Sequence, residues 1–418
     1  MSDKAQKDLK FNYALNITEA SFWGLGAGLA STAAVLPLFL SKYTDSAILF
    51  GLIPAIQTIG FQLPQLFMAN RVASQKRIVP FMMRLTIHER VPFLGLAIIA
   101  LFAESMPPAI VITLIFLMLI WQGIGSGITG NAWQNMIVKI IPTDIRSTFF
   151  SIQGAGVNLL MSVGALLAGL LLENQPGTTG YAISFLVAFV AMMISYALIG
   201  KTREQPEITQ NEVNERTPLL RSAMKILKED KNFRSFVIIR FLTPFATMAS
   251  AFYVIYLVKT FEIDEQTVGI MTSVLFISTV VSGLILGWIS DHIGRKFALV
   301  LCFIIMAIAP LLAFFAQSLA FFYIVFILTG IIHGSFWSVF LAFSLEFGDN
   351  QTRPVYIGLV NTLIAPSTLV AQLLGGWIAD GFSYQTTFVL AAVFALITAL
   401  ISIVFVKMPH KRMVLDPA

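Results

Sequence analysis

Twelve apolar stretches, each long enough to cross a membrane as a helix, limit what this chain can fold into. A crossing needs about 20 mostly apolar residues. The stretches run over 12–40, 46–69, 78–103, 107–138, 147–172, 180–200, 233–259, 266–290, 297–316, 319–345, 354–379 and 384–407. Only 12% of the residues are charged, against about 25% in a soluble domain. We therefore predict an all-α membrane protein, because helices satisfy their own backbone groups in lipid.

The lysines and arginines fall almost entirely in every second connection between the stretches. With the amino terminus inside, the inner segments hold Lys4, Lys7, Lys10, Arg71, Lys76, Arg77, Lys139, Arg146, Arg295, Lys296, Arg353, Lys407, Lys411 and Arg412. The outer loops hold only Lys42 and Lys259. Because cytoplasmic loops carry such an excess, we expect a multi-pass protein of the plasma (inner) membrane with both termini cytoplasmic. The net charge of +5 then reports topology and predicts no nucleic-acid partner.

The longest hydrophilic stretch, 201–232, lies between the sixth and seventh spans. It divides the chain into two predicted six-helix bundles, residues 1–200 and 233–418. Leu220, Ala223, Met224 and Leu227 recur at helical spacing, which predicts a short amphipathic surface helix inside this cytoplasmic linker. A plain tether is the alternative interpretation.

The two halves repeat each other in sequence. Arg146 and Arg353 are 353 − 146 = 207 positions apart. At the same offset fall the pairs Gly123 and Gly330, Gly127 and Gly334, Gly169 and Gly376, and Glu173 and Asp380. Such a repeat predicts parallel bundles related by a pseudo-twofold axis along the membrane normal.

The connection after the eighth span carries a motif. It reads Gly287, Trp288, Ile289, Ser290, Asp291, His292, Ile293, Gly294, Arg295 and Lys296. This G-x-x-x-D-x-x-G-R-K string resembles the cytoplasmic signature of the major facilitator superfamily. The corresponding first-half stretch, 70–77, is degenerate. The resemblance covers the whole chain and implies a fold of twelve transmembrane helices in two bundles that transport by alternating access.

The residues of this motif have local physical roles. Gly287 would allow close approach of a neighbouring helix, and Gly294 a tight turn. Asp291 suits a helix amino terminus, where free N–H groups favour an anion. A basic cytoplasmic turn alone would explain Arg295 and Lys296, but neither Asp291 nor the glycines.

The resemblance also implies a conformational gate. It places Asp291 against the start of the fifth span, near Arg146, when the cytoplasmic side is closed. It places Arg295 at the inner end of the tenth span, at Glu346. These contacts are expected to break when the cavity opens to the cytoplasm.

Charged residues inside the spans are the next signal, because an ionisable group at bilayer depth costs about 2.5–3.5 kcal/mol. One helical face of the first span holds Asn16, Glu19 and Trp23, and one of the seventh holds Arg240, Thr243 and Thr247. The resemblance implies that spans one, four, seven and ten line a central cavity. We therefore predict that Glu19 and Arg240 face it and pair there, with Glu19 a candidate for proton coupling. A pair that merely locks the halves together is the alternative.

Further candidates are weaker. His333 and Trp337 share a face of the tenth span, and Asn131 and Asn361 lie in the fourth and eleventh. The third span carries Arg84, His88, Glu89 and Arg90. We interpret this group as a buried structural network, with a proton relay through Glu89 and His88 as the alternative.

The chain shows no pattern of an enzyme. It contains no phosphate-binding G-x-x-x-x-G-K-[ST] loop, no zinc-site spacing and a single cysteine, Cys302, so we expect no cofactor or metal. The expected function is secondary active transport of a small organic solute, coupled to protons, by a monomer in the lipid bilayer. Proton-driven efflux of amphiphilic drug-like compounds and a non-transporting receptor-like role are the alternatives.

Overall fold

The computed structural model describes residues 3–73, 75–205, 226–344, 347 and 353–407, and the regular secondary structure in these residues is helical. Side chains of some helical residues, Ser147, Trp337 and Asn361 among them, lie outside the description. The amino-terminal half contains α1 (Asp3–Leu29), α2 (Val35–Ser41), α3 (Ala47–Ala73), α4 (Ile78–Phe102), η1 (Ala103–Ser105), α5 (Pro108–Ile140), α6 (Thr143–Asn174) and α7 (Thr179–Ile199). The carboxyl-terminal half contains α9 (Lys231–Thr247), η2 (Met248–Ala251), α10 (Tyr253–Phe261), α11 (Glu265–His292), α12 (Arg295–Phe315), α13 (Leu319–Ser335), η3 (Phe336–Phe340), α14 (Leu341–Ser344), α15 (Arg353–Gly381) and α16 (Tyr384–Phe405).

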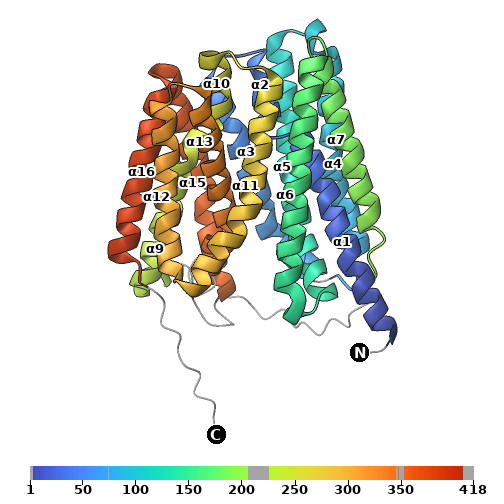
Figure 1. Cartoon of the computed structure of the whole chain (residues 1–418). Coiled ribbons are helices and arrows are strands. Elements are labelled where there is room, and N and C mark those ends of the chain that lie inside the picture. Colours follow the sequence, from blue (N-terminus) through green and yellow to red (C-terminus); the bar gives the residue numbers. More distant parts are fainter. Residues whose placement is uncertain (1–2, 74, 206–225, 345–346, 348–352, 408–418) are drawn as a thin grey trace.

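The helices form two bundles that stand side by side, as Figure 1 shows. In the described part of the chain, eleven helical segments are long and apolar enough to cross a membrane. α1 is equally long but more polar, and it packs along α6 and α7 to complete the six helices of its half. The expected all-α membrane fold of two six-helix bundles is confirmed.

The start of α1 and the end of α16 lie at the same end of the molecule (Figure 1). The opposite end, called the distal end below, carries the α2–α3, α6–α7, α10–α11 and α15–α16 connections. Most of the linker, including Leu220, Ala223 and Met224, lies outside the described residues, so its amphipathic helix stays a prediction. The linker's first residues fold onto the amino-terminal half, where the carboxylate of Glu204 accepts hydrogen bonds from the first N–H groups of α4.

The sequence repeat reappears in the packing. A methyl group on Gly169 of α6 would lie 2.9 Å from Cα of Gly269 in α11, and one on Gly376 of α15 would lie 2.6 Å from Cα of Ile48 in α3. Both contacts join the two halves, and Gly169 and Gly376 are separated by the 207-residue offset. Backbones approach this closely only where small residues meet, which is how helices associate in lipid.

Two of the expected continuous spans are broken at related positions. The first divides into α1 and α2, and the seventh divides into α9 and α10 through the 3₁₀ turn η2. Ser31 stabilises the first break, because its carbonyl accepts from the N–H groups of Ala34 and Leu36. The two short helices, α2 and α10, contact each other at the distal end.

The tenth span is also irregular. Where the sequence predicts one helix over 319–345, residues Phe336–Phe340 form a π-helical turn between α13 and α14. Such turns inside α-helices are frequent at functional sites because they redirect side chains. This turn lies beside the central cavity.

Contacts between the halves close the distal end. Asp380, at the end of α15, accepts hydrogen bonds from the N–H groups of Ala47 (2.6 Å) and Ile48 (3.2 Å) and so caps α3 of the other half. Lys259 forms an ion pair of 2.8 Å with Asp45, and this hydrogen bond lowers the pKa of the exposed Asp45 carboxyl. All hydrogen bonds and ion pairs that join the halves within the described residues lie toward this end.

A disulfide should lock this closed end. Ser162 of α6 and Ser273 of α11 are hydrogen-bonded across the interface, with their Oγ atoms 2.5 Å apart. We expect the double variant Ser162→Cys/Ser273→Cys to form a disulfide under mild oxidation, because the two side-chain oxygens that the sulfur atoms would replace are already in contact. Solute exchange in vesicles should then stop and return on reduction.

The two single variants are the controls. Each should remain active under oxidant, because the native Cys302 is buried and offers no partner. Cross-linking that leaves exchange intact would mean that this interface does not open during transport.

Candidate functional site: a central cavity and a buried charge cluster

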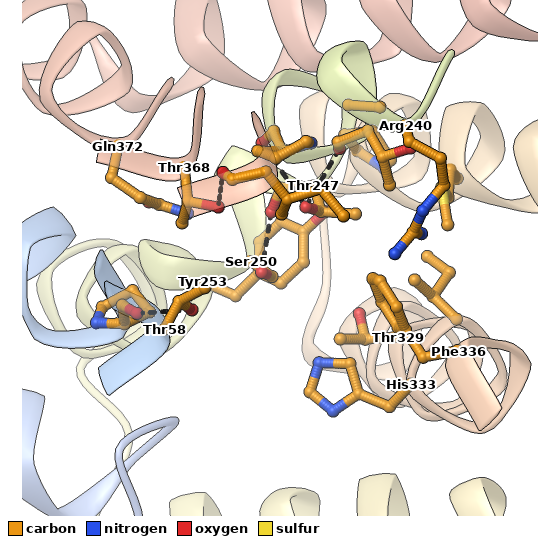
Figure 2. A pocket seen from close by; sticks show the side chains of 18 of the residues that line it. Thr58, Arg240, Thr247, Ser250, Tyr253, Thr329, His333, Phe336, Thr368 and Gln372 are labelled. Carbon is orange, nitrogen blue, oxygen red and sulfur yellow. Dashed lines mark hydrogen bonds between the residues drawn. The ribbon is translucent and has the colours of Figure 1, made fainter. Parts of the chain in front are cut away.

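A cavity of about 270 Å³ lies between the two halves (Figure 2). Most of its wall comes from α9, η2, α10, α12, α13, η3 and α15, and the opposite wall comes from α3. The lining residues are Pro54, Thr58, Gln62, Arg240, Thr243, Pro244, Ala246, Thr247, Ser250, Tyr253, Met306, Pro310, Thr329, Ile332, His333, Phe336, Ile364, Thr368 and Gln372. Its size and its mixture of apolar and polar groups fit a small organic molecule.

Arg240 provides the charge of this cavity. Its Nε and Nη1 atoms are buried and have no hydrogen-bond partner among the described residues. The guanidinium carbon lies 4.9 Å from the ring centre of Phe340 and 5.7 Å from that of Phe336, both in the π-helical turn. In Figure 2 the guanidinium group points inward toward Phe336.

The aromatic contacts do not compensate fully for burying this charge. A buried arginine at the centre of a span costs about 2.5–3.5 kcal/mol. A cation–π contact returns about 0.5–2 kcal/mol and leaves the N–H donors unused. The site is therefore electrostatically incomplete, and an anion in the cavity would complete it.

The other polar groups of the cavity are neutral. The hydroxyl groups of Thr243, Thr247 and Ser250 donate to carbonyl groups of their own helical segment. The amide oxygens of Gln62 and Gln372 are buried without a partner among the described residues. In Figure 2, Gln372 lies on the opposite side of the drawn site from Arg240. The cavity thus has one cationic side and one neutral polar side.

Four of the residues predicted for the cavity line it: Arg240, Thr243, Thr247 and His333. Asn16, Glu19, Trp23 and Asn131 are not among the lining residues. The amide of Asn16 bonds to Asn12 and Thr202, and that of Asn131 accepts from Asn135 on its own helix. The side chains of Trp337 and Asn361 lie outside the description.

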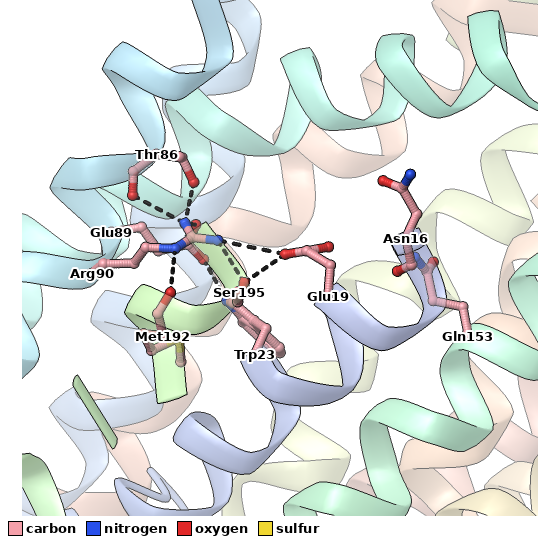
Figure 3. Close-up of polar contacts among 9 residues, drawn as sticks. All are labelled: Asn16, Glu19, Trp23, Thr86, Glu89, Arg90, Gln153, Met192 and Ser195. Carbon is pink, nitrogen blue, oxygen red and sulfur yellow. Dashed lines mark hydrogen bonds and ion pairs between the residues drawn. The ribbon is translucent and has the colours of Figure 1, made fainter. Parts of the chain in front are cut away.

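The expected pairing of Glu19 with Arg240 is wrong. Glu19 is 3% exposed and pairs with Arg90 of α4, with Oε1 and Nη2 3.6 Å apart (Figure 3). The hydroxyl of Ser195 on α7 donates to the same oxygen at 2.6 Å. The side chain turns away from the other half because α1 packs against α7 of its own bundle, where both partners are close.

Arg90 organises this cluster and is only 1% exposed. Its Nε donates to the carbonyl of Met192 on α7, and its Nη1 donates to the carbonyl and the hydroxyl of Thr86. Nη1 also lies 3.3 Å from Oε2 of Glu89. Three helices, α1, α4 and α7, therefore meet at one guanidinium group.

The second carboxylate of the cluster, Glu89, links it back to α1. Trp23 donates its indole N–H to Glu89 Oε1 at 3.0 Å. His88 does not join the cluster; it accepts from Trp121, at 3.3 Å, on an exposed face. The structure thus brings together Glu19, Trp23, Glu89 and Arg90. It does not place His88 where it could relay a proton to Glu89.

The motif residues lie at the end of the molecule that carries the termini. Asp291 is exposed and makes no hydrogen bond or ion pair with a described residue. Arg146 instead donates to the last carbonyls of α5, those of Val138 and Ile141. Lys296 donates to the carbonyl of Ile403. Because the described residues show no bond between Asp291 and Arg146, this gate contact stays a prediction for the opposite conformation.

The two motif glycines differ. Gly294 has φ +141°, a value that side chains rarely adopt, and so supports the predicted turn. Gly287 shows no close approach in this state, because a methyl group there would meet only Cβ of Ser338, at 3.9 Å. Glu346, the predicted partner of Arg295, lies outside the described residues.

Several cavity residues were not predicted, and one available signal was overlooked. Pro54, Pro244 and Pro310 lie inside three different spans and all line the cavity. A proline inside a membrane helix frees a carbonyl group and is tolerated where protein or water can satisfy it. These three prolines were therefore a signal for the cavity that the sequence offered beside its polar residues.

The similarity of this sequence to known proteins agrees with this architecture. The sequence matches the family described as the Major Facilitator Superfamily over residues 20–257 and 236–417. The chain belongs to this superfamily. It is accordingly a transporter and not an enzyme.

Individual members of the superfamily resemble it over different lengths. A probable 4-methylmuconolactone transporter of Cupriavidus pinatubonensis is 30% identical over 151 residues, which are 35% of this chain and 35% of that protein. The match thus spans about a third of that relative's length. A D-xylose–proton symporter structure gives a TM-score of 0.75 at 14% identity, covering 95% of this chain and 98% of that one. A bacterial homologue of the lysosomal transporter Spinster, inward-facing and unoccupied, gives 0.71 at 13%, covering 99% and 100%.

Removing the central guanidinium should destabilise the protein strongly. In Arg90→Met, Glu19 and Glu89 lose their common partner inside the bundle. Breaking a buried pair from one side costs about 3–5 kcal/mol, so we expect a large fall in the unfolding temperature of the purified protein.

Arg84→Met is the matched control, because Arg84 is exposed on the same helix and should tolerate the change. Adding Glu19→Gln to Arg90→Met should restore part of the loss. Equal unfolding temperatures for Arg84→Met and Arg90→Met would contradict a structural ion cluster.

Proposed function

We propose that this chain is a secondary active transporter that moves a small organic solute by alternating access and is driven by protons. The observation that carries the proposal is a solute-sized cavity between two halves that contact each other at the distal end. A cavity placed at such an interface can be exposed to either side by rocking one bundle against the other. Topology with both termini in the cytoplasm, residence in the inner membrane and action as a monomer belong to the same proposal.

The closed distal end supports this mechanism. It is held by close glycine contacts and by polar groups at the rim, such as Asp380 on the amino terminus of α3. Water can replace those rim hydrogen bonds when the end opens, so no charged group is left unsolvated in lipid. In the opposite state, Asp291 and Arg146 would come together as the superfamily's signature implies, and Arg295 would reach Glu346.

We propose the buried cluster of Glu19, Glu89 and Arg90 as the proton site. Two carboxylates surround one guanidinium, so full ionisation would leave one unbalanced negative charge inside the membrane. A proton on one carboxyl group removes that imbalance, and buried carboxyl groups in transporters commonly serve as proton relays. Loss of the proton would strengthen the pull of the free carboxylate on Arg90.

Close packing offers a route from this cluster to the other half. Gly24 and Gly28 of α1 lie against the backbone of α6, and Gly164 of α6 lies against α1. Further along α6, Ser162 contacts Ser273 of α11 in the other half. A shift of α1 that follows a change at Glu19 would therefore move α6 and strain its contact with α11.

Transport assays with Glu19→Gln test the coupling. Purified protein in vesicles should take up one or more radiolabelled solutes from a panel of sugars, carboxylic acids and cationic dyes, and uptake should rise when a proton gradient is imposed. In Glu19→Gln the gradient should no longer increase uptake, while exchange of the same solute across the membrane continues. The reason is that the glutamine cannot release a proton but preserves the size of the side chain.

Glu173→Gln is the control, since Glu173 is exposed at the end of α6 and is not part of the cluster. It should behave as the native protein. Gradient-driven uptake that persists in Glu19→Gln would reject this residue as the coupling site. Absence of uptake for every class of solute by the native protein would reject the transport proposal.

A further inference from the structure

We propose that the solute is a small organic anion whose carboxylate binds Arg240 and whose apolar body rests against Phe336. This inference deepens the proposed function, on which it rests, by naming the chemical class that the same cavity would carry. It starts from the unpartnered guanidinium group.

The charge of the cavity favours an anion. Among its described lining residues, Arg240 is the permanent charge, His333 is the other titratable base, and no carboxylate is present. The ion cluster of Glu19, Glu89 and Arg90 is self-contained and does not line the cavity. A cleft with low-dielectric walls and one sign of charge concentrates ligands of the opposite sign.

The geometry of Arg240 leaves its donors available. The guanidinium carbon lies near the rings of Phe340 and Phe336, but Nε and Nη1 have no acceptor among the described residues. An aromatic ring attracts the cation without supplying a hydrogen-bond oxygen, so the planar set of N–H donors stays available. A carboxylate can accept from two guanidinium N–H groups at once, which makes it a well-matched ligand.

The remaining walls define the rest of the solute. Beside Arg240 the lining includes the apolar side chains of Ile332, Phe336 and Met306. The cavity volume of about 270 Å³ limits the solute to a small molecule. The charge and the apolar side chains together therefore favour a monocarboxylate with a compact ring or branched chain over a large cationic drug.

Binding measured in detergent separates this inference from transport. The probes are acetate, benzoate, cyclohexanecarboxylate and gluconate, each compared with its neutral amide, and xylose. A ligand that binds the folded state raises its unfolding temperature. We expect at least one carboxylate, most strongly one with an apolar ring, to stabilise the native protein, whereas the matching amide and xylose do not.

Variants of Arg240 then assign the contact. Arg240→Gln should weaken binding of the stabilising carboxylate on the order of 100-fold, because charge-assisted hydrogen bonds are lost. Arg240→Lys should weaken it less, since it keeps the charge but cannot stack or present a planar set of donors. Arg84→Gln removes an exposed arginine outside the cavity and should bind as the native protein does.

The outcomes are distinct. If no carboxylate stabilises the native protein more than its amide does, or if Arg240→Gln binds as tightly as native, the inference is overturned. Should Arg240→Gln fail to fold, Arg240→Lys and Phe336→Leu give the same comparison, with selective loss of carboxylate binding expected. Uptake of a neutral or cationic solute without carboxylate binding would reject the anion inference and leave the transporter proposal standing. Carboxylate binding without uptake of any solute would support the anion inference and reject the transporter proposal.

Discussion

Close approach of helix backbones at glycine residues is the interaction on which this architecture depends. In lipid no hydrophobic effect drives helices together, so association relies on close packing and on hydrogen bonds between helices. Gly24 and Gly28 bring α1 onto α6, Gly127 brings α5 onto α3, and Gly169 brings α6 onto α11. The same kind of contact thus builds each bundle and also joins the bundles to each other.

Charge is distributed very differently over the two bundles. In the amino-terminal half, Arg90 pairs with two carboxylates and donates to two hydroxyls and two carbonyls, so the cluster is complete within the protein. In the carboxyl-terminal half, Arg240 has aromatic neighbours but no acceptor for Nε or Nη1. The charge of Arg90 is therefore satisfied by contacts within the fold, whereas Arg240 keeps unpaired donors at the wall of the cavity.

The fold could be predicted well from the sequence because the fold depends on properties, such as hydropathy, that add up along the chain. Hydropathy located the spans, and the 207-residue offset located glycines that do pack equivalently, such as Gly169 and Gly376. A helical face also identified Arg240 correctly as a residue turned toward the cavity.

The partner of Glu19 could not be obtained in this way. The polar faces of the first and seventh spans suggested Arg240, but α1 lies against α7, and the observed partner Arg90 belongs to the third span. Helical periodicity says which side of a helix is polar and not which neighbour that side meets. The breaks at η2 and at the π-helical turn were also missed, and both lie at the wall of the cavity.

Asp380 has a consequence that reaches beyond the distal rim. A helix cap of this type is worth about 1 kcal/mol, which changes the ratio of two conformations about fivefold. Because a solute binds with an apparent affinity scaled by the fraction of molecules in the competent state, this carboxylate tunes affinity on both sides of the membrane without touching the solute. Substitutions at the rim would thus adjust the apparent affinity to a low or a high concentration of solute, while the residues that bind the solute stay unchanged.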